Sequence, residues 1–214
     1  MNVKNNIILA LDLMNLEDSV KLCQLLEDDL NTIKIGYPLT LAEGLNAVST
    51  IKDLGFNVIC DYKVADIDAT NSKICDVTFT SGADAIICHG FVGKDSVQAC
   101  LDVANDYNKE IFLLTEMSHP GARKFLQPNA DEIARMGREM GIKNYVAPAT
   151  RTDRLKEIRE IVGSDAFIIS PGVGKQGGDV KKTLEISNAA IIGRSIYESE
   201  DPKKALNNFI DLIY

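Results

Sequence analysis

Short apolar segments and longer segments of helical periodicity alternate along this chain, and the alternation repeats eight times. The apolar segments are rich in isoleucine, which is typical of parallel strands that are buried on both faces. We predict strands at residues 7–12, 32–36, 55–60, 85–90, 111–117, 145–149, 166–171 and 189–194. We predict helices at residues 16–28, 40–54, 70–81, 95–106, 130–140, 152–162, 181–186 and 202–213. Because a helix follows each strand, the pattern predicts an α/β fold, a closed (β/α)8 TIM barrel.

The length of the chain, 214 residues, suits a single barrel domain spanning residues 1–214. Barrels of this type usually have about 250 residues, so we expect a compact form with short loops. The alternative architecture is an open, doubly wound sheet, whose dinucleotide-binding form carries Gly-x-Gly-x-x-Gly after the first strand. No such motif follows residues 7–12, and no linker divides the chain. We therefore favour the closed barrel.

The net charge of −8 argues against some classes of partner. An acidic protein is a poor non-specific binder of nucleic acid and of anionic membrane surfaces. No apolar run approaches the roughly 20 residues of a membrane span. The first residues lead into a strand without a signal-peptide pattern. We therefore expect a cytoplasmic protein with no nucleic-acid or membrane partner, in which a local site holds any phosphate ligand.

The cysteines are predicted to be reduced thiols of the core. Their number is odd, no Cys-x-x-Cys spacing occurs, and most lie among apolar residues, as in cytosolic proteins. They are Cys23, Cys60, Cys75, Cys88 and Cys100. No His-x-His or His-x-x-x-His spacing indicates a metal site, and no pyridoxal phosphate or thiamine motif is present. We expect no disulfide, no metal and no cofactor.

A row of charged residues follows the third predicted strand. Side chains alternate along a strand, so Asp61 and Lys63 project to one side and Tyr62 to the other. Asp66 follows just past the strand end, within reach of Lys63. Opposite charges at the end of a buried strand are costly unless they face a polar site. A row of fixed charges in such a site is what a charge-separating reaction needs. The alternative interpretation is a surface loop with a stray ion pair.

Polar residues also stand at the ends of the other predicted strands. In a barrel of this kind the functional groups lie at the C-terminal ends of the strands. Lys34 lies between two isoleucines and so faces opposite to them. His89 is expected to form a hydrogen bond at the rim, and Ser118, which has no evident His or Asp partner, is expected to contact a ligand. The strand-end residues are Asp12, Lys34, Asp61, Lys63, His89, Ser118, Pro171, Gly193 and Arg194.

Two glycine-containing segments, residues 170–179 and 191–197, follow the last two predicted strands. Glycines let backbone N–H groups approach an anion, and Arg194 can pair bidentately with phosphate oxygens. The loops after strands seven and eight are the usual phosphate site of this fold. The alternative is that the glycines only form turns and that Arg194 is solvated. The length and glycine content of the first segment predict a mobile lid.

Together these residues resemble the orotidine 5'-monophosphate decarboxylase family, in its compact archaeal form, over nearly the whole chain. Asp-x-Lys-x-x-Asp alone marks a wider group of phosphate-sugar barrels, and the Ser-His-Pro-Gly and Gln-Gly-Gly segments make the match more specific. The matching segments are Leu-Ala-Leu-Asp at Asp12, Ile-Lys-Ile-Gly at Lys34, Asp61 to Thr70, Thr115 to Gly121, Ser170 to Gly174, Gln176 to Gly178, and Gly193-Arg194. Many relatives have proline where this chain has Asp68, a difference that concerns only the local loop conformation.

The resemblance implies conversion of orotidine 5'-phosphate to UMP and CO2, the last step of de novo pyrimidine synthesis, with no cofactor. It implies that Lys63 protonates the ring carbon that loses CO2 and that Asp61 lies beside the departing carboxylate. It also implies that Lys34 and Asp66 extend the charge row, and that Asp12 and Lys34 bind ribose hydroxyls.

The resemblance further implies a homodimer in which Asp66 and Thr70 reach the partner's ligand. Ser118 would read the pyrimidine edge, while Gln176, Gly193 and Arg194 would hold the phosphate as the loop closes. The remaining expected ligand contacts are Ile67, Pro171, Gly172 and Val173.

Physical reasoning supports a role for Lys63 independently. Loss of CO2 from that ring leaves a localised carbanion with no electron sink, so a preorganised cation must stabilise it. One alternative is a magnesium-dependent sugar-phosphate decarboxylase or aldolase, but Lys34 stands where such an enzyme needs a carboxylate. Another is a non-catalytic nucleotide-phosphate binder, which would need the phosphate loops but not Lys63.

Overall fold

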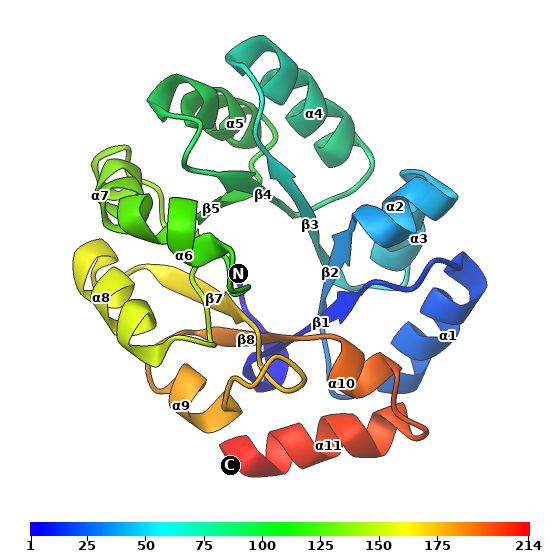
Figure 1. The fold of residues 1–214 in the computed structure, drawn as a ribbon. Helices are drawn as coiled ribbons and strands as arrows, with labels where there is room; N and C mark the ends of the chain where they lie inside the picture. Colours follow the sequence, from blue (N-terminus) through cyan, green and yellow to red (C-terminus); the bar gives the residue numbers. More distant parts are fainter.

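The computed structural model describes residues 1–214 and forms a closed barrel of eight parallel strands in sequence order. Helices surround the ring of strands (Figure 1). The barrel closes where β1 pairs with β8. The strands are β1 (Ile7–Leu11), β2 (Thr32–Gly36), β3 (Asn57–Val64), β4 (Ala85–His89), β5 (Glu110–Leu114), β6 (Asn144–Val146), β7 (Phe167–Pro171) and β8 (Ala189–Ile192). The predicted single-domain (β/α)8 barrel is confirmed.

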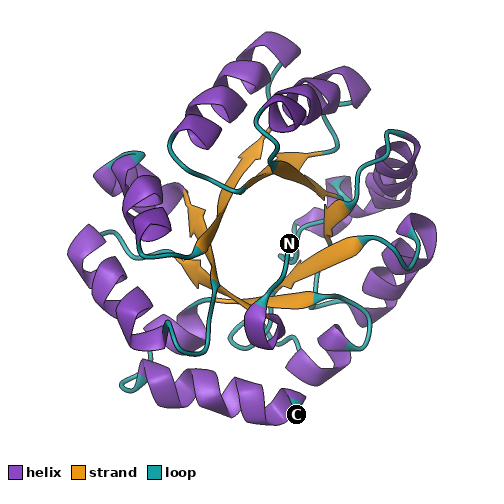
Figure 2. Cartoon of the chain, turned by 180° about the vertical axis from the view of Figure 1, so that it is seen from behind, coloured by secondary structure: helices purple, strands orange, loops and turns teal.

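The helices form the outer layer of the molecule (Figure 2). They are α1 (Leu16–Leu26), α2 (Tyr37–Glu43), α3 (Asn46–Asp53), α4 (Asp68–Thr80), α5 (Lys94–Asp106), α6 (Ala122–Phe125), α7 (Ala130–Glu139), α8 (Thr152–Val162), α9 (Val180–Leu184), α10 (Arg194–Tyr197) and α11 (Pro202–Ile213), with 3-10 turns η1 (Lys4–Asn6) and η2 (Gln127–Asn129). None of the helices has both the length and the apolar character needed to cross a lipid bilayer.

The alternation of side chains along each strand creates two apolar layers. In β1, Ile7 and Leu9 belong to the core between strands and helices, while Ile8 and Ala10 belong to a smaller cluster inside the barrel. Lys34 lies on β2 between Ile33 and Ile35, which both belong to the outer core. The sequence-based orientation of Lys34 toward the barrel interior is therefore correct.

The N-terminal segment covers the end of the barrel at which the strands begin. Met1 and Val3 pack against the inner cluster. The N-terminal ammonium lies 3.4 Å from Oε1 of Glu110, the first residue of β5. Figures 1 and 2 show this terminus within the ring of strands. This packing leaves the opposite end, formed by the C-terminal ends of the strands, for a binding site.

The prediction of a single helix at residues 40–54 is wrong, because two helices, α2 and α3, occupy this segment. Gly44 follows α2 with a φ of 74°, and its N–H donates to the carbonyl of Thr40 at 2.8 Å. A glycine with positive φ is a common helix end. The first helix of the pair also begins earlier than predicted, at Tyr37, and the short helices α6 and α10 were not predicted.

The segment after β3 also differs from the prediction. The strand extends to Val64 instead of ending at residue 60, and α4 begins at Asp68 instead of residue 70. Asp68 is the first residue of α4, where proline is favoured and where an acidic side chain complements the helix dipole. Proline and aspartate therefore both suit this position, proline through its fixed φ and aspartate through its negative charge.

Candidate active site

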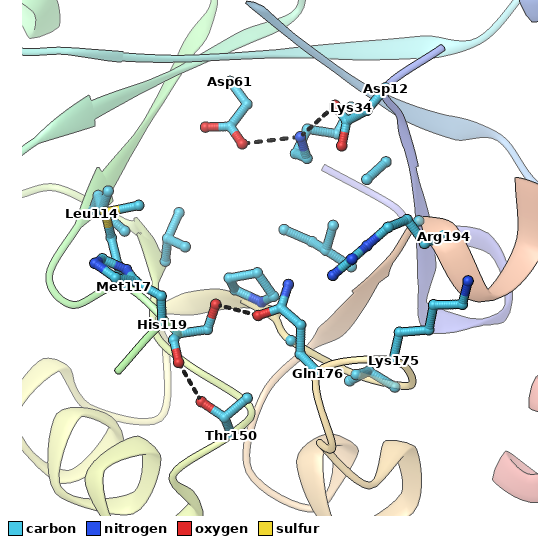
Figure 3. A pocket seen from close by; sticks show the side chains of 18 of the residues that line it. Asp12, Lys34, Asp61, Leu114, Met117, His119, Thr150, Lys175, Gln176 and Arg194 are labelled. Carbon is cyan, nitrogen blue, oxygen red and sulfur yellow. Dashed lines mark hydrogen bonds and ion pairs between the residues drawn. The ribbon is translucent and has the colours of Figure 1, made fainter. Parts of the chain in front are cut away.

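A cavity of about 770 Å³ opens at the C-terminal end of the barrel. Figure 3 shows side chains from several strand ends pointing into it. The structure brings together most of the side chains singled out from the sequence. Those that line the cavity are Asp12, Lys34, Asp61, Lys63, Ser118, Pro171, Gly172, Val173, Gln176, Gly193 and Arg194.

The charged side chains of β2 and β3 form a connected row. Asp61 lies between two lysines, with its Oδ2 2.9 Å from Nζ of Lys34 and its Oδ1 2.8 Å from Nζ of Lys63. Asp12, just beyond β1, extends the row, with its Oδ1 3.8 Å from Nζ of Lys34 (Figure 3). The side chain of Lys34 is only 7% exposed. A buried ammonium is stable only when anions surround it, which Asp61 and Asp12 do.

The mutual pairing keeps the row ionised. Burial alone would raise the pKa of Asp61, but the ammonium groups of Lys34 and Lys63 outweigh it and hold the pKa at about 2. Burial alone would lower the pKa of Lys34, but Asp61 and Asp12 leave it above its ordinary value. Both groups are therefore charged at neutral pH, and a ligand meets a fixed pattern of charges.

Lys63 has an unusual backbone conformation. Its φ is 45°, in the left-handed region, where the other non-glycine residues of this chain are all asparagines. The β3–β4 register shifts between Cys60 and Val64. The Tyr37 hydroxyl donates a 2.5 Å hydrogen bond to the carbonyl of Tyr62, next to the strained residue. Such strain persists only where the surroundings enforce it, and it clusters at functional sites.

Three predicted ligand residues lie outside the cavity of their own chain. Asp66 and Ile67 are exposed, Thr70 is half-buried, and none of them lines the cavity. The Asp66 carboxylate accepts a 2.7 Å bond from the Ile67 N–H, and no ion pair joins it to Lys63. The contact between Asp66 and Lys63 expected from their spacing is therefore not formed within one chain.

The loop after β7 folds back on itself through its glycines. Gly172 has a φ of 106°, and its carbonyl accepts from the N–H of Gly178 at 2.9 Å. A Cβ on Gly178 would lie 2.6 Å from that carbonyl oxygen, so only glycine fits there. This turn holds Gln176 in the cavity, where its Oε1 accepts from Oγ of Ser118 at 2.8 Å (Figure 3). Arg194 points into the same space from the start of α10.

Several lining residues were not identified from the sequence. Ile87, Leu114 and Val146 form an apolar part of the wall, and Thr150 and Arg151 follow β6. Apolar residues at inward positions look the same in a sequence whether they fill the barrel or line a site. Only their strand-end location could have indicated them.

His89 does not form the expected hydrogen bond at the rim. Its side chain is buried, and Nδ1 has no partner. Burial and the nearby charge of Lys63 lower the pKa of His89 to about 4. The imidazole is therefore neutral at physiological pH. It packs at an angle against Phe91, with the ring centroids 4.6 Å apart and the ring planes 58° apart.

The sequence model of the orotidine 5'-phosphate decarboxylase / HUMPS family matches residues 5–209. The chain belongs to this family. A protein named orotidine 5'-phosphate decarboxylase from Methanosphaera stadtmanae is 60% identical over 214 residues, covering 100% of this chain and 99% of its own. Another of that name from Methanococcoides burtonii is 44% identical over 212 residues, covering 99% and 98%. The predicted family and enzyme class, a carboxy-lyase, are confirmed.

Solved structures of decarboxylases in this family have the same fold. The Methanocaldococcus jannaschii orotidine 5'-monophosphate decarboxylase, complexed with the inhibitor BMP, matches with a TM-score of 0.92 at 45% identity, covering 97% of each chain. The Pyrococcus horikoshii orotidine 5'-phosphate decarboxylase matches with a TM-score of 0.89 at 35% identity, covering 97% of this chain and 98% of its own. The fold assignment therefore extends over nearly the whole chain.

Proposed function

We propose that this chain converts orotidine 5'-phosphate to UMP and CO2 in de novo pyrimidine synthesis, without a cofactor. The observation that carries the proposal is the row in which Asp61 pairs with Lys34 and Lys63, in the same cavity as Gln176 and Arg194. Membership of the decarboxylase family supports the choice of reaction.

In the proposed reaction Lys63 supplies the proton. The bond between the ring carbon and the carboxylate breaks, CO2 leaves, and the electron pair stays on the ring carbon. The ammonium of Lys63 then transfers a proton to that carbon, and the neutral amine regains a proton from solvent. Because the ion pair with Asp61 fixes this ammonium, it can stabilise the developing carbanion without reorganisation.

Asp61 is proposed to lie beside the departing carboxylate. Two carboxylates about 4 Å apart repel by roughly 4 kcal/mol at an effective dielectric of ~20, and the repulsion disappears as CO2 leaves. Lys34 and Lys63 offset part of it, so ground-state repulsion is the secondary contribution. The apolar wall of Ile87, Leu114 and Val146 also suits uncharged CO2 better than a carboxylate.

The other groups of the cavity are proposed to bind the rest of the substrate. Asp12 and Lys34 bind ribose hydroxyls, and Ser118 reads the pyrimidine edge. Gln176, Gly193 and Arg194 hold the phosphate, while Pro171, Gly172 and Val173 contact the ligand as the loop closes. Binding energy from the non-reacting phosphate can then be used to close the loop and fix the charge row.

Arg194→Ala is expected to lower kcat as well as to raise KM. If Arg194 only attached the substrate, its loss would raise KM alone. If phosphate binding also drives loop closure, the variant should lose roughly 10- to 100-fold in kcat, because a small misplacement of reacting groups has that effect. Steady-state kinetics with orotidine 5'-phosphate measure both constants. An unchanged kcat would refute the coupling.

The proposed assembly is a homodimer in which Asp66, Ile67 and Thr70 serve the partner's site. These residues are exposed or half-buried in the single chain. Ile67 is 65% exposed, and Phe91, on the neighbouring loop after β4, is 54% exposed. Exposed apolar side chains beside a polar functional residue favour a contact with another protein surface.

Mixing two inactive variants tests the shared site. Lys63→Ala lacks the proton donor, and Asp66→Asn lacks the charge proposed to cross the interface. A mixed dimer would contain one site with both groups intact, so re-equilibrated mixtures should recover about a quarter of the wild-type sites. The control is each variant taken alone through the same treatment. If native mass spectrometry detected mixed dimers but no activity were recovered, the shared site would be refuted.

One assay separates the proposal from its alternatives. Purified protein treated with excess EDTA should still convert orotidine 5'-phosphate to UMP, followed by ultraviolet absorbance. A magnesium-dependent sugar-phosphate enzyme would lose its activity. Such a metal would also meet Lys34, whose ammonium lies between Asp12 and Asp61. Loss of activity on metal removal, restored by Mg²⁺, would overturn the cofactor-free proposal.

We also propose that the protein is located in the cytoplasm. All five cysteines are buried and unpaired. Buried free thiols are typical of proteins in a reducing compartment.

A further inference from the structure

Glu116, two residues past the end of β5, carries a buried carboxylate that does not line the cavity. Its side chain is 0% exposed and lies between two arginines from the β6–α8 region. It accepts hydrogen bonds from Nε of Arg151 at 2.9 Å and from Nε of Arg154 at 3.2 Å. A second nitrogen of Arg151, Nη2, lies 2.7 Å from Oε1. A carboxylate without solvent contact is stable only with such partners.

Arg151 transmits this pairing to the segment that enters the cavity. Its Nη1 donates to the carbonyl of Ser118 at 3.1 Å, and its Nη2 donates to the carbonyl of Met117. The hydroxyl of Thr150 donates to the Ser118 carbonyl at 3.0 Å. Thr150 and Arg151 thus fix the backbone at Ser118. Arg151 makes most of these hydrogen bonds, and the Glu116 carboxylate fixes the plane of its guanidinium.

Ser118 in turn connects to the loop after β7. Its hydroxyl donates to Oε1 of Gln176 at 2.8 Å. A continuous set of hydrogen bonds therefore runs from Glu116 through Arg151 and Ser118 to Gln176. Gln176 lies across the cavity from Asp61 and Lys34 (Figure 3).

We propose that Glu116 is a positioning residue, whose carboxylate orients Arg151 so that Ser118 is preset to meet both the ligand and Gln176. The proposal rests on the function proposed above. The competing role is purely structural, in which Glu116 only ties β5 to α8. The two roles differ in whether the effect of Glu116 depends on the Ser118 hydroxyl.

The test is a double-mutant cycle with Glu116→Gln and Ser118→Ala. Glutamine keeps the size of the side chain but places an N–H₂ group against an arginine, so Arg151 should lose its fixed orientation. Glu116→Gln alone should lower kcat/KM for orotidine 5'-phosphate by about 10- to 100-fold. In the Ser118→Ala background the same change should lower kcat/KM by less than about twofold, because Glu116 is proposed to act through Ser118.

A matched control is Asp131→Asn. The Asp131 carboxylate pairs with the outer side of Arg154, 2.5 Å from Nη2, and does not touch Arg151. Its loss should leave kcat/KM unchanged. If Glu116→Gln does not fold, Arg151→Lys in the same cycle replaces it, since lysine keeps a cation for Glu116 but loses the fork to the two carbonyls.

For each variant of the cycle, kcat/KM is measured by steady-state kinetics and the affinity for UMP by calorimetry. Wild-type activity in Glu116→Gln, or independent effects that multiply in the double variant, would overturn the positioning role. A wild-type chain that bound UMP without turnover would refute the proposed decarboxylation, while the cycle in UMP affinity would still decide the role of Glu116.

Discussion

Lys63→Ala is expected to lower kcat/KM for orotidine 5'-phosphate by about 10⁴-fold or more. The variant loses both the proton donor and the cation that stabilises the carbanion, and each such contribution is typically worth at least about 10²-fold. The fold should persist, because Asp61 keeps its 2.9 Å pair with Lys34. The loss should appear in kcat, with UMP still bound, and quenched-flow or long-time ultraviolet assays can measure it.

The control for this variant is Lys73→Ala, which removes an exposed lysine from α4 that forms no ion pair. It should retain full activity. Residual activity of Lys63→Ala within tenfold of wild type would show that another group delivers the proton. Activity lost together with the native circular dichroism spectrum would instead indicate that the strained backbone at Lys63, with its φ of 45°, depends on this side chain.

Asp61→Asn is the second substitution for which we expect a large effect. It removes the anion that separates two ammonium groups 2.9 and 2.8 Å away. Because Lys34 and Lys63 offset part of the repulsion of roughly 4 kcal/mol, its loss alone would cost less than about 10³-fold in rate. The misplacement of Lys63, which loses its anionic partner, supplies the rest. We therefore expect kcat/KM to fall by about 10³-fold or more. Asp106→Asn, at the exposed end of α5, is the control and should retain activity.

The same variant should change the acid dependence of folding. The pKa of Asp61 is about 2 in the folded chain, against an ordinary value of 3.8. A depressed pKa means that the ionised carboxylate stabilises the fold above about pH 4, by roughly 2 kcal/mol, and that this contribution is lost as pH falls through about 2. Urea unfolding should therefore show Asp61→Asn less stable than wild type at pH 7. The difference should shrink toward pH 2, and a constant difference would contradict the assignment.

Local patterns in the sequence predicted the fold and most of the residues of the candidate site. The eightfold strand–helix repeat, without the glycine motif of an open dinucleotide-binding sheet, favoured a closed barrel. The alternation of side chains along a strand was sufficient to turn Lys34 inward and to place Asp61 and Lys63 on one face. Glycine content and strand order were sufficient to locate the loop that carries Gln176.

Tertiary structure decided how these side chains meet. Strand pairing brings Lys34 of β2 against Asp61 of β3, and Lys63 lies where the β3–β4 register shifts. The sequence spacing had instead suggested Asp66 as the partner of Lys63. Glu116 reads in the sequence as one more polar residue at a strand end, yet the fold buries it between Arg151 and Arg154. Periodicity is a property of neighbouring residues, but an ion pair depends on distances between strands, which only the closed barrel fixes.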